Sequence, residues 1–185
     1  MIAGGCASRA DPPAGEAAVE PAETTNPTTR SRLAGEPFVS IGAKVTKVVD
    51  GDTIHVRIDG ANVDETIRLI GIDTPETKKP NTPVECFGTE ASTNLKTLLP
   101  TETRVRLNGD VEGRDKYDRL LAYVIREPDG LFVNRAQVEE GFAAPYRYPP
   151  NVAHADELSE AGRRAREGDR GLWSRCDGPH STTAR

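Results

Sequence analysis

The sequence predicts an α+β fold that is mainly a β barrel, with five strands and about three helices. Five short runs of β-branched or alternating apolar residues are bounded by turn residues, which is typical of strands. One helical stretch separates the third run from the fourth, and two more follow the fifth. The 185 residues are enough for one domain of this kind together with a tail.

The first three strands are expected to follow one another as a meander. They are predicted over residues 41–49, 53–58 and 65–72. The turn sequences Asp50-Gly51-Asp52 and Asp59-Gly60 would connect them. Pro75 follows the third strand and ends it, because proline has no backbone N–H to donate. Three short strands in succession predict a small barrel or a strongly curled sheet.

The rest of the domain contains two strands and three helices. After a loop over 74–84, the sequence predicts a helix over 88–99, strands over 103–108 and within 117–126, and helices over 132–141 and 154–168. Strand five is nearly all apolar, which predicts burial on both faces. Leu172 and Trp173 are expected to dock the C-terminus on the core. Five strands with a helix between the third and fourth match the order of an OB-fold.

The two ends of the chain differ in composition from the domain, which we place at residues 38–178. Residues 1–37 are rich in Ala, Pro, Glu, Thr and Gly and predict a disordered tether. Residues 179–185 are interpreted as a flexible tail. The small residues before Cys6 resemble the end of a bacterial lipoprotein signal, with Cys6 as the lipidated residue, but the charged and apolar parts of a signal are missing. A plain disordered N-terminus is the alternative.

Charge and cysteine content narrow the class of protein. The formal charge of −5 argues against a protein held on nucleic acid by bulk positive charge, yet it allows an enzyme that acts on nucleic acid through a few arginines and a cation. No apolar run approaches about 18 residues, so we expect no membrane span. With Cys6 set aside, Cys86 and Cys176 remain as one disulfide pair of an exported protein, or as two free thiols of a cytosolic one.

Two carboxylates are predicted to share a cation. Asp52 comes at the start of the second strand and Asp73 at the end of the third, and antiparallel neighbours bring these ends together. Oxygen ligands without histidine or cysteine favour Ca²⁺, with Mg²⁺ second. Each aspartate taken alone is also an ordinary turn residue. The three histidines do not cluster in the sequence, and we assign them no role.

Three further residues suit phosphodiester hydrolysis. Glu76, just beyond the cation site, can act as a general base on water. Arg68 and Arg119 can bind phosphate oxygens and stabilise transition-state charge. The alternatives are a solvated loop glutamate, a salt bridge across the barrel for Arg68 and a surface charge for Arg119. Contacts to phosphate or stacking on bases are expected of four residues, with a half-buried core role as the alternative for the last two: Lys116, Tyr117, Tyr146 and Tyr148.

Three ordered motifs resemble the staphylococcal nuclease (thermonuclease) family. They are Val49-Asp50-Gly51-Asp52-Thr53, the stretch from Ile67 to Glu76, and Asp115-Lys116-Tyr117-Asp118-Arg119, and the likeness covers about residues 40–175. The resemblance implies a calcium-dependent phosphodiesterase on an OB-fold that cleaves DNA and RNA, single strands preferred, on the 5′ side of the phosphodiester and leaves 3′-phosphates. It also implies that the backbone carbonyl of Thr74 is a third calcium ligand.

Two departures from the family pattern affect what we expect. Asp118 stands where the family usually has glycine, so its carboxylate could pair with Arg119 or alter the turn. The chain is acidic whereas well-known members are basic, which predicts weak and salt-dependent substrate binding.

Alternatives from other classes are a non-catalytic OB-fold that binds nucleic acid or protein, and a structural lipoprotein that binds calcium for stability. We expect an extracellular or cell-envelope bacterial protein, a monomer by default, with contact to the membrane only through a lipid on Cys6.

Overall fold

The computed structural model describes residues 1–2, 40–61, 63–77, 83–127 and 129–185. Cys6 and all but the first two residues of the predicted tether lie outside this part of the chain. Among the described residues, no helix is long and apolar enough to span a bilayer.

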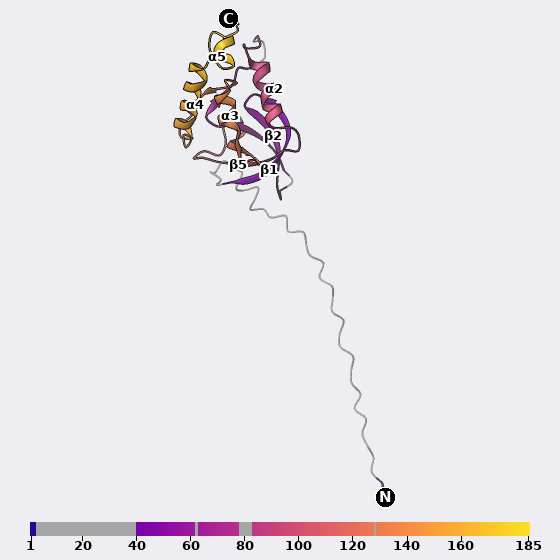
Figure 1. Ribbon diagram of the computed structural model, residues 1–185. Helices are drawn as coiled ribbons and strands as arrows, with labels where there is room; N and C mark the ends of the chain where they lie inside the picture. The colour runs from indigo at the N-terminus through magenta and orange to yellow at the C-terminus, as the bar shows by residue number, and fades with distance from the viewer. Residues whose placement is uncertain (3–39, 62, 78–82, 128) are drawn as a thin grey trace.

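Five strands close into a barrel, which confirms the predicted fold class (Figure 1). They are β1 (Ile41–Asp50), β2 (Thr53–Ile58), β3 (Asp64–Leu69), β5 (Arg104–Asn108) and β6 (Leu120–Arg126). The order is β3-β2-β1-β5-β6, and the two end strands, β3 and β6, pair in parallel to complete the cylinder. The short β7 (Leu131–Phe132) extends β6, and β4 (Ile72–Asp73) pairs separately with β8 (Ala144–Pro145).

The barrel interior is the hydrophobic core. Alternating residues of β1 and β2 point inward, and Val45, Ile54 and Val56 have no exposed surface. The first five residues of β6 are all buried, as the apolar sequence of strand five predicts, because the barrel covers one face of this strand and α3 covers part of the other.

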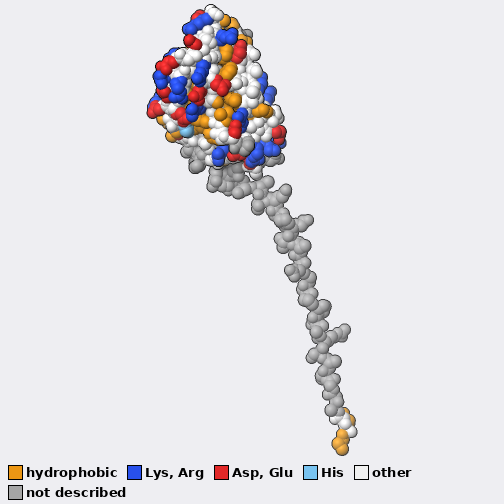
Figure 2. All heavy atoms as spheres, viewed as in Figure 1, with side chains coloured by type: hydrophobic (Ala, Val, Ile, Leu, Met, Phe, Trp, Pro, Cys, Tyr) orange, Lys and Arg blue, Asp and Glu red, His pale blue; other side chains and the backbone are white. Residues whose placement is uncertain are grey.

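In the part of the chain that the structure describes, four helices accompany the barrel: α2 (Gly88–Leu98), α3 (Val133–Glu139), α4 (Ala155–Glu167) and α5 (Leu172–Arg175). In Figure 1, α4 lies on the left of the molecule and α2 on the right, with α3 between them and α5 at the top. Leu172 and Trp173 are buried against Ala144 and Ala165, so the predicted docking of the C-terminus is confirmed. Figure 2 shows acidic and basic side chains interspersed over the face that carries α4, rather than a basic patch.

The predicted third strand over 65–72 is wrong at its C-terminal end. The strand stops at Leu69, and the chain then turns at Gly71, whose φ of 79° is left-handed and suits a residue without a Cβ. Beyond the turn, Ile72 and Asp73 pair with residues 144–145 instead of continuing along β2. Arg68 stabilises the turn because its Nη1 donates to the carbonyl oxygens of both Leu69 and Ile72, at 2.8 and 2.9 Å.

Candidate active site

A cleft of about 740 Å³ opens where the β1–β2 turn, the β3–β4 turn and the start of β6 meet. An adjoining pocket of about 320 Å³ continues from it toward β8. Arg68, Asp73, Tyr117 and Arg119 line both cavities. The structure thus brings residues from six separate stretches of the chain to one connected surface: 49–53, 66–76, 85, 115–121, 146–148 and 180.

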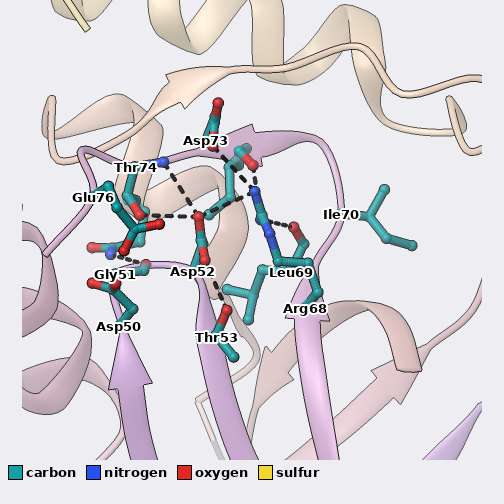
Figure 3. A network of polar contacts seen from close by, with 12 residues as sticks. Asp50, Gly51, Asp52, Thr53, Arg68, Leu69, Ile70, Asp73, Thr74 and Glu76 are labelled. Carbon is teal, nitrogen blue, oxygen red and sulfur yellow. Dashed lines mark hydrogen bonds and ion pairs between the residues drawn. The ribbon is translucent and has the colours of Figure 1, made fainter. Parts of the chain in front are cut away.

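Arg68 lies at the centre of the cleft and links the two predicted cation ligands (Figure 3). Its Nη2 is 3.1 Å from Oδ2 of Asp52 and 3.2 Å from Oδ1 of Asp73. Because both oxygens contact the same nitrogen, the two carboxylates face one small volume. Thr74 is buried next to them and donates to Asp52 from its hydroxyl at 3.0 Å. Arg68 therefore forms a salt bridge, as one of the sequence alternatives held, but the bridge lies inside the cleft.

Buried amides position the loops that carry these groups. Gln137 of α3 is fully buried and donates its Nε2 hydrogen to the carbonyl oxygen of Gly51, at 2.8 Å. Asn134, one turn earlier, donates to the carbonyl oxygen of Ile70 at 2.8 Å and accepts a hydrogen bond from the backbone N–H of Val124. Helix α3 thereby fixes the β1–β2 turn and the β3–β4 turn relative to the barrel.

Glu76 lies at the edge of the same cleft. Its backbone N–H donates to Oε2 of Glu85 at 2.8 Å, and its own Oε1 accepts from the N–H of Thr77 at 3.0 Å. Burial, followed by a hydrogen bond to the Glu76 carboxyl group, raises the pKa of Asp50. The Asp50 carboxyl group thus lies beside that of Glu76 and is easier to protonate than a solvated aspartate.

Arg119 is held by Asp115 of the same loop. Its Nε and Nη2 both lie 2.7 Å from Oδ2 of Asp115, whose side chain is only 8% exposed. Asp118 does not make the pairing with Arg119 that the sequence left open, because its carboxylate lies 3.5 Å from Arg114 instead. Asp118 does take the left-handed conformation, with φ of 63°, that suits the glycine usual in the family. Arg119 is thus a paired arginine that lines the cleft, not a solvated surface charge.

The four predicted substrate-binding residues all line the smaller pocket: Lys116, Tyr117, Tyr146 and Tyr148. The rings of Tyr146 and Tyr148 lie 6.2 Å apart, and the side chain of Tyr117 is two-thirds exposed. Tyr148 also packs against the buried cluster around Tyr123, so for this residue a core role and a binding role coexist. Exposed aromatic faces beside a lysine suit the stacking of a base.

The charge of the cleft indicates a need for a cation. Five carboxylic side chains line the cleft: Asp50, Asp52, Asp73, Glu76 and Glu85. The basic side chains that line it are Arg68, Arg119 and His180. Burial raises the pKa of Asp73, although the charge of Arg68 opposes this effect. Such an excess of negative charge disfavours the entry of an anionic phosphodiester unless a bound cation offsets it.

The donor atoms fit a hard cation. Asp52, Asp73 and the carbonyl of Thr74 offer only oxygen, which Ca²⁺ and Mg²⁺ prefer, and such ions complete their shells with water. Within the described ranges, no group of three or more His, Cys, Asp or Glu side chains is arranged to hold a metal ion by itself. A bound ion would accordingly rest on two carboxylates, a backbone oxygen and solvent.

Residues 66–175 match the family model described as staphylococcal nuclease homologue. The chain belongs to the staphylococcal nuclease family. It is 45% identical to the thermonuclease of Staphylococcus intermedius over 131 residues, which cover 71% of this chain and 75% of that protein. It is 41% identical to the thermonuclease of Staphylococcus hyicus, over 75% of this chain and 83% of the relative. The SPbeta prophage-derived endonuclease YokF of Bacillus subtilis (strain 168) is 40% identical, over 73% of this chain and 45% of YokF.

Four acidic or histidine side chains that line the two cavities were not predicted from the sequence: Asp50, Glu85, Asp115 and His180. Asp50 and Asp115 stand inside the motifs that resemble the family, so their carboxylates could have been found there. Glu85 and His180 are 95 positions apart, yet Oε2 of Glu85 lies 2.8 Å from Nδ1 of His180. No local pattern predicts that contact, because it depends on how the C-terminus docks.

The predicted cysteine pair forms a disulfide in the structure. Cys86, just before α2, is bonded to Cys176, which follows α5, with 5.9 Å between the Cα atoms. Cys176 is fully buried and packs in the same cluster as Trp173. The disulfide thereby ties the end of the chain to the loop that carries Glu85.

Proposed function

We propose that this chain is a calcium-dependent nuclease that hydrolyses phosphodiester bonds of DNA and RNA. The observation that carries the proposal is the convergence of a glutamate, two arginines and two aspartates in one cleft: Glu76, Arg68, Arg119, Asp52 and Asp73. Membership of a family with thermonuclease and endonuclease relatives supports the reaction class.

Each residue has a role that its position supports. Glu76 acts as general base and takes a proton from the attacking water. Arg68 lies in β3 and Arg119 directly precedes the neighbouring strand β6, so both can approach the phosphate and stabilise the charge that develops on its oxygens. Asp52, Asp73 and the Thr74 carbonyl would hold Ca²⁺, which when bound supplies Lewis-acid charge neutralisation at the phosphate.

The smaller pocket would take the nucleotide. Tyr146 and Tyr148 offer ring faces to a base, while Lys116 and Tyr117 lie where a neighbouring phosphate would pass. Stacking of this kind needs unpaired bases, so we propose a preference for single strands. Cleavage on the 5′ side of the phosphodiester, leaving 3′-phosphates, remains the expectation from the family.

We also propose that the protein is exported. The Cys86–Cys176 disulfide suits an oxidising compartment such as the cell envelope or the extracellular medium. A lipid on Cys6, which lies outside the described residues, would tether the domain to a membrane. Labelling cells with a radioactive fatty acid would test this, since a Cys6→Ser variant should lose the label.

The nuclease proposal is tested by digesting single-stranded DNA and RNA with the purified chain, first with calcium and then with EGTA, and by identifying the product ends. We expect cleavage only with calcium, and 3′-phosphate ends. A folded protein that binds the strand without cutting it would instead be a binding module. A protein that is stabilised by calcium but neither binds nor cuts would be a structural calcium-binding protein.

A further inference from the structure

The C-terminal segment after Cys176 returns to the cleft. We define it as residues 177–185, of which the last seven, 179–185, are predicted from the sequence to be a flexible tail. Its Ser181 accepts a hydrogen bond from the N–H of Cys86 at 2.7 Å, and the N–H of Arg185 donates to the carbonyl oxygen of Arg175 at 2.8 Å. The segment is therefore attached at its middle and at its C-terminal end to the region of the disulfide.

This docking places His180 against one of the predicted calcium ligands. Nε2 of His180 lies 3.1 Å from Oδ2 of Asp73, and its Nδ1 lies 2.8 Å from Oε2 of Glu85. The imidazole lines the cleft that also contains Glu76 and Arg119. It is 46% exposed, whereas the Glu85 carboxylate that it contacts is only 12% exposed.

The two oxygens of Asp73 have separate partners. Oδ1 contacts Arg68 and faces Asp52, whereas Oδ2 contacts His180. With one oxygen held from each side, the carboxylate group is restrained from rotating, and Oδ1 stays directed toward the volume that it shares with Asp52. Hydrogen bonds of this kind to the outer oxygen of a ligating carboxylate orient the ligand.

The same imidazole reaches the loop of the proposed base. Oε2 of Glu85, which contacts His180, also accepts the backbone N–H of Glu76 at 2.8 Å. A continuous chain of contacts therefore runs from Asp73 through His180 and Glu85 to Glu76. It joins the cation ligand to the base without using either of the arginines.

We propose that His180 is a positioning residue of the active site, delivered by the disulfide-anchored C-terminal segment, which orients Asp73 for calcium and restrains the loop of Glu76. The inference rests on the proposed function. Under this inference, residues 177–185 contribute a side chain to the active site and are not merely a tail.

The test is a calcium titration of the full chain by isothermal calorimetry, without substrate. His180→Ala should weaken calcium binding by about 10–100-fold, the effect typical of losing an outer-sphere partner. His180→Gln retains an amide donor and should recover part of the affinity. Ser181→Ala is the matched control, because among the described residues its hydroxyl hydrogen-bonds only with Thr183, and its loss should leave calcium binding unchanged.

A second measurement separates positioning from general stability. Thermal unfolding in EGTA should give the same midpoint for His180→Ala and the unsubstituted chain, while kcat at saturating calcium falls. Selective reduction of the disulfide should reproduce the loss of calcium affinity in the unsubstituted chain and add little to it in His180→Ala.

Three results would overturn the inference. Unchanged calcium affinity in His180→Ala would show that Asp73 needs no outer partner. Tighter binding would show that His180 competes with the cation instead of preparing its site. If the unsubstituted chain cleaves DNA but binds no calcium, the cation role under the proposed function fails first and this inference fails with it.

Discussion

The carboxyl group of Glu76 lies beside that of Asp50, while its backbone N–H is held by Glu85. Glu76→Gln keeps the size of the side chain but cannot accept a proton from water. We expect kcat for single-stranded DNA to fall by about a hundredfold or more. The exposed Glu90 on α2 gives the control, since Glu90→Gln should cleave at the unsubstituted rate. Near-normal activity of Glu76→Gln would contradict the assignment of the base.

Arg119 depends on Asp115 for its orientation, because both of its contacting nitrogens bind the same oxygen. Asp115→Asn removes the charge of this partner while keeping its shape. A charge-assisted hydrogen bond contributes about 1.5–3 kcal/mol, so kcat/KM should fall by roughly 10–100-fold. Steady-state kinetics would measure the fall in kcat/KM. The control variant is Asp64→Asn, because Asp64 forms an exposed ion pair with Arg57. If Asp115→Asn and Asp64→Asn have the same kcat/KM, Asp115 does not position Arg119 for catalysis.

Asp118 is the departure from the family pattern that the sequence leaves hardest to judge. Its carboxylate is 89% exposed and lies 3.5 Å from Arg114, and an ion pair whose carboxylate is so well solvated contributes about 0–1 kcal/mol. Asp118→Gly should therefore change kcat by less than about threefold. A gain of tenfold or more on the same DNA substrate would show that the carboxylate restrains Arg119 after all.

At the scale of elements, the β3–β4 turn connects Arg68 to Asp73, with which it forms an ion pair. Gly71 is left-handed, and a Cβ added there would collide with a terminal methyl group of Leu158 on α4. Gly71→Ala should lower the free energy of unfolding by about 2–4 kcal/mol, from backbone strain and overpacking together. Urea denaturation would measure the change.

Gly130 provides the matched control for this prediction. It is also left-handed, with φ of 70°, but a Cβ there would meet no atom of the described residues within 4 Å. Gly130→Ala should cost only the strain of about 1–2 kcal/mol and leave the site unchanged. Equal losses in the two variants would mean that contact with α4 does not matter.

The long elements could be predicted from the sequence because each has its own periodicity. Strand β2 alternates along its length, and α4 ends at Gly168 as the sequence predicts. The two-residue strands β4 and β8 carry no such signal, so the third predicted strand ran through Gly71 to residue 72. Only the pairing of Asp73 with Ala144, from a distant part of the chain, reveals the turn.

At the scale of the whole molecule, the disulfide closes a loop of 90 residues between Cys86 and Cys176. In the chain-entropy account, such a cross-link stabilises the fold by about 3–5 kcal/mol. The double variant Cys86→Ser, Cys176→Ser should lose that amount in urea denaturation and become insensitive to reductant. A loss below about 1 kcal/mol would show that the chain ends are held by packing alone.

The site residues that could be predicted and the one that could not also differ in how local their signal is. Asp52, Arg68 and Glu76 lie in or beside turns within 25 positions of one another, so residue type and spacing are enough to predict that they form one site. His180 reaches the cleft only through α5, the disulfide and the docking of residues 177–185. Its role depends on long-range packing that no window of sequence contains.

The parallel pairing of β3 with β6 also has a kinetic consequence. Ile67 pairs with Leu120, from a distant part of the chain, and this pairing brings Arg68 of β3 close to Arg119, which directly precedes β6. During refolding, local hairpins such as β1–β2 can form early, whereas a pairing between distant segments forms late. A chain diluted from urea should therefore regain its β-sheet signal before it regains the ability to cut. The recovery of cleavage would time the closing of the barrel.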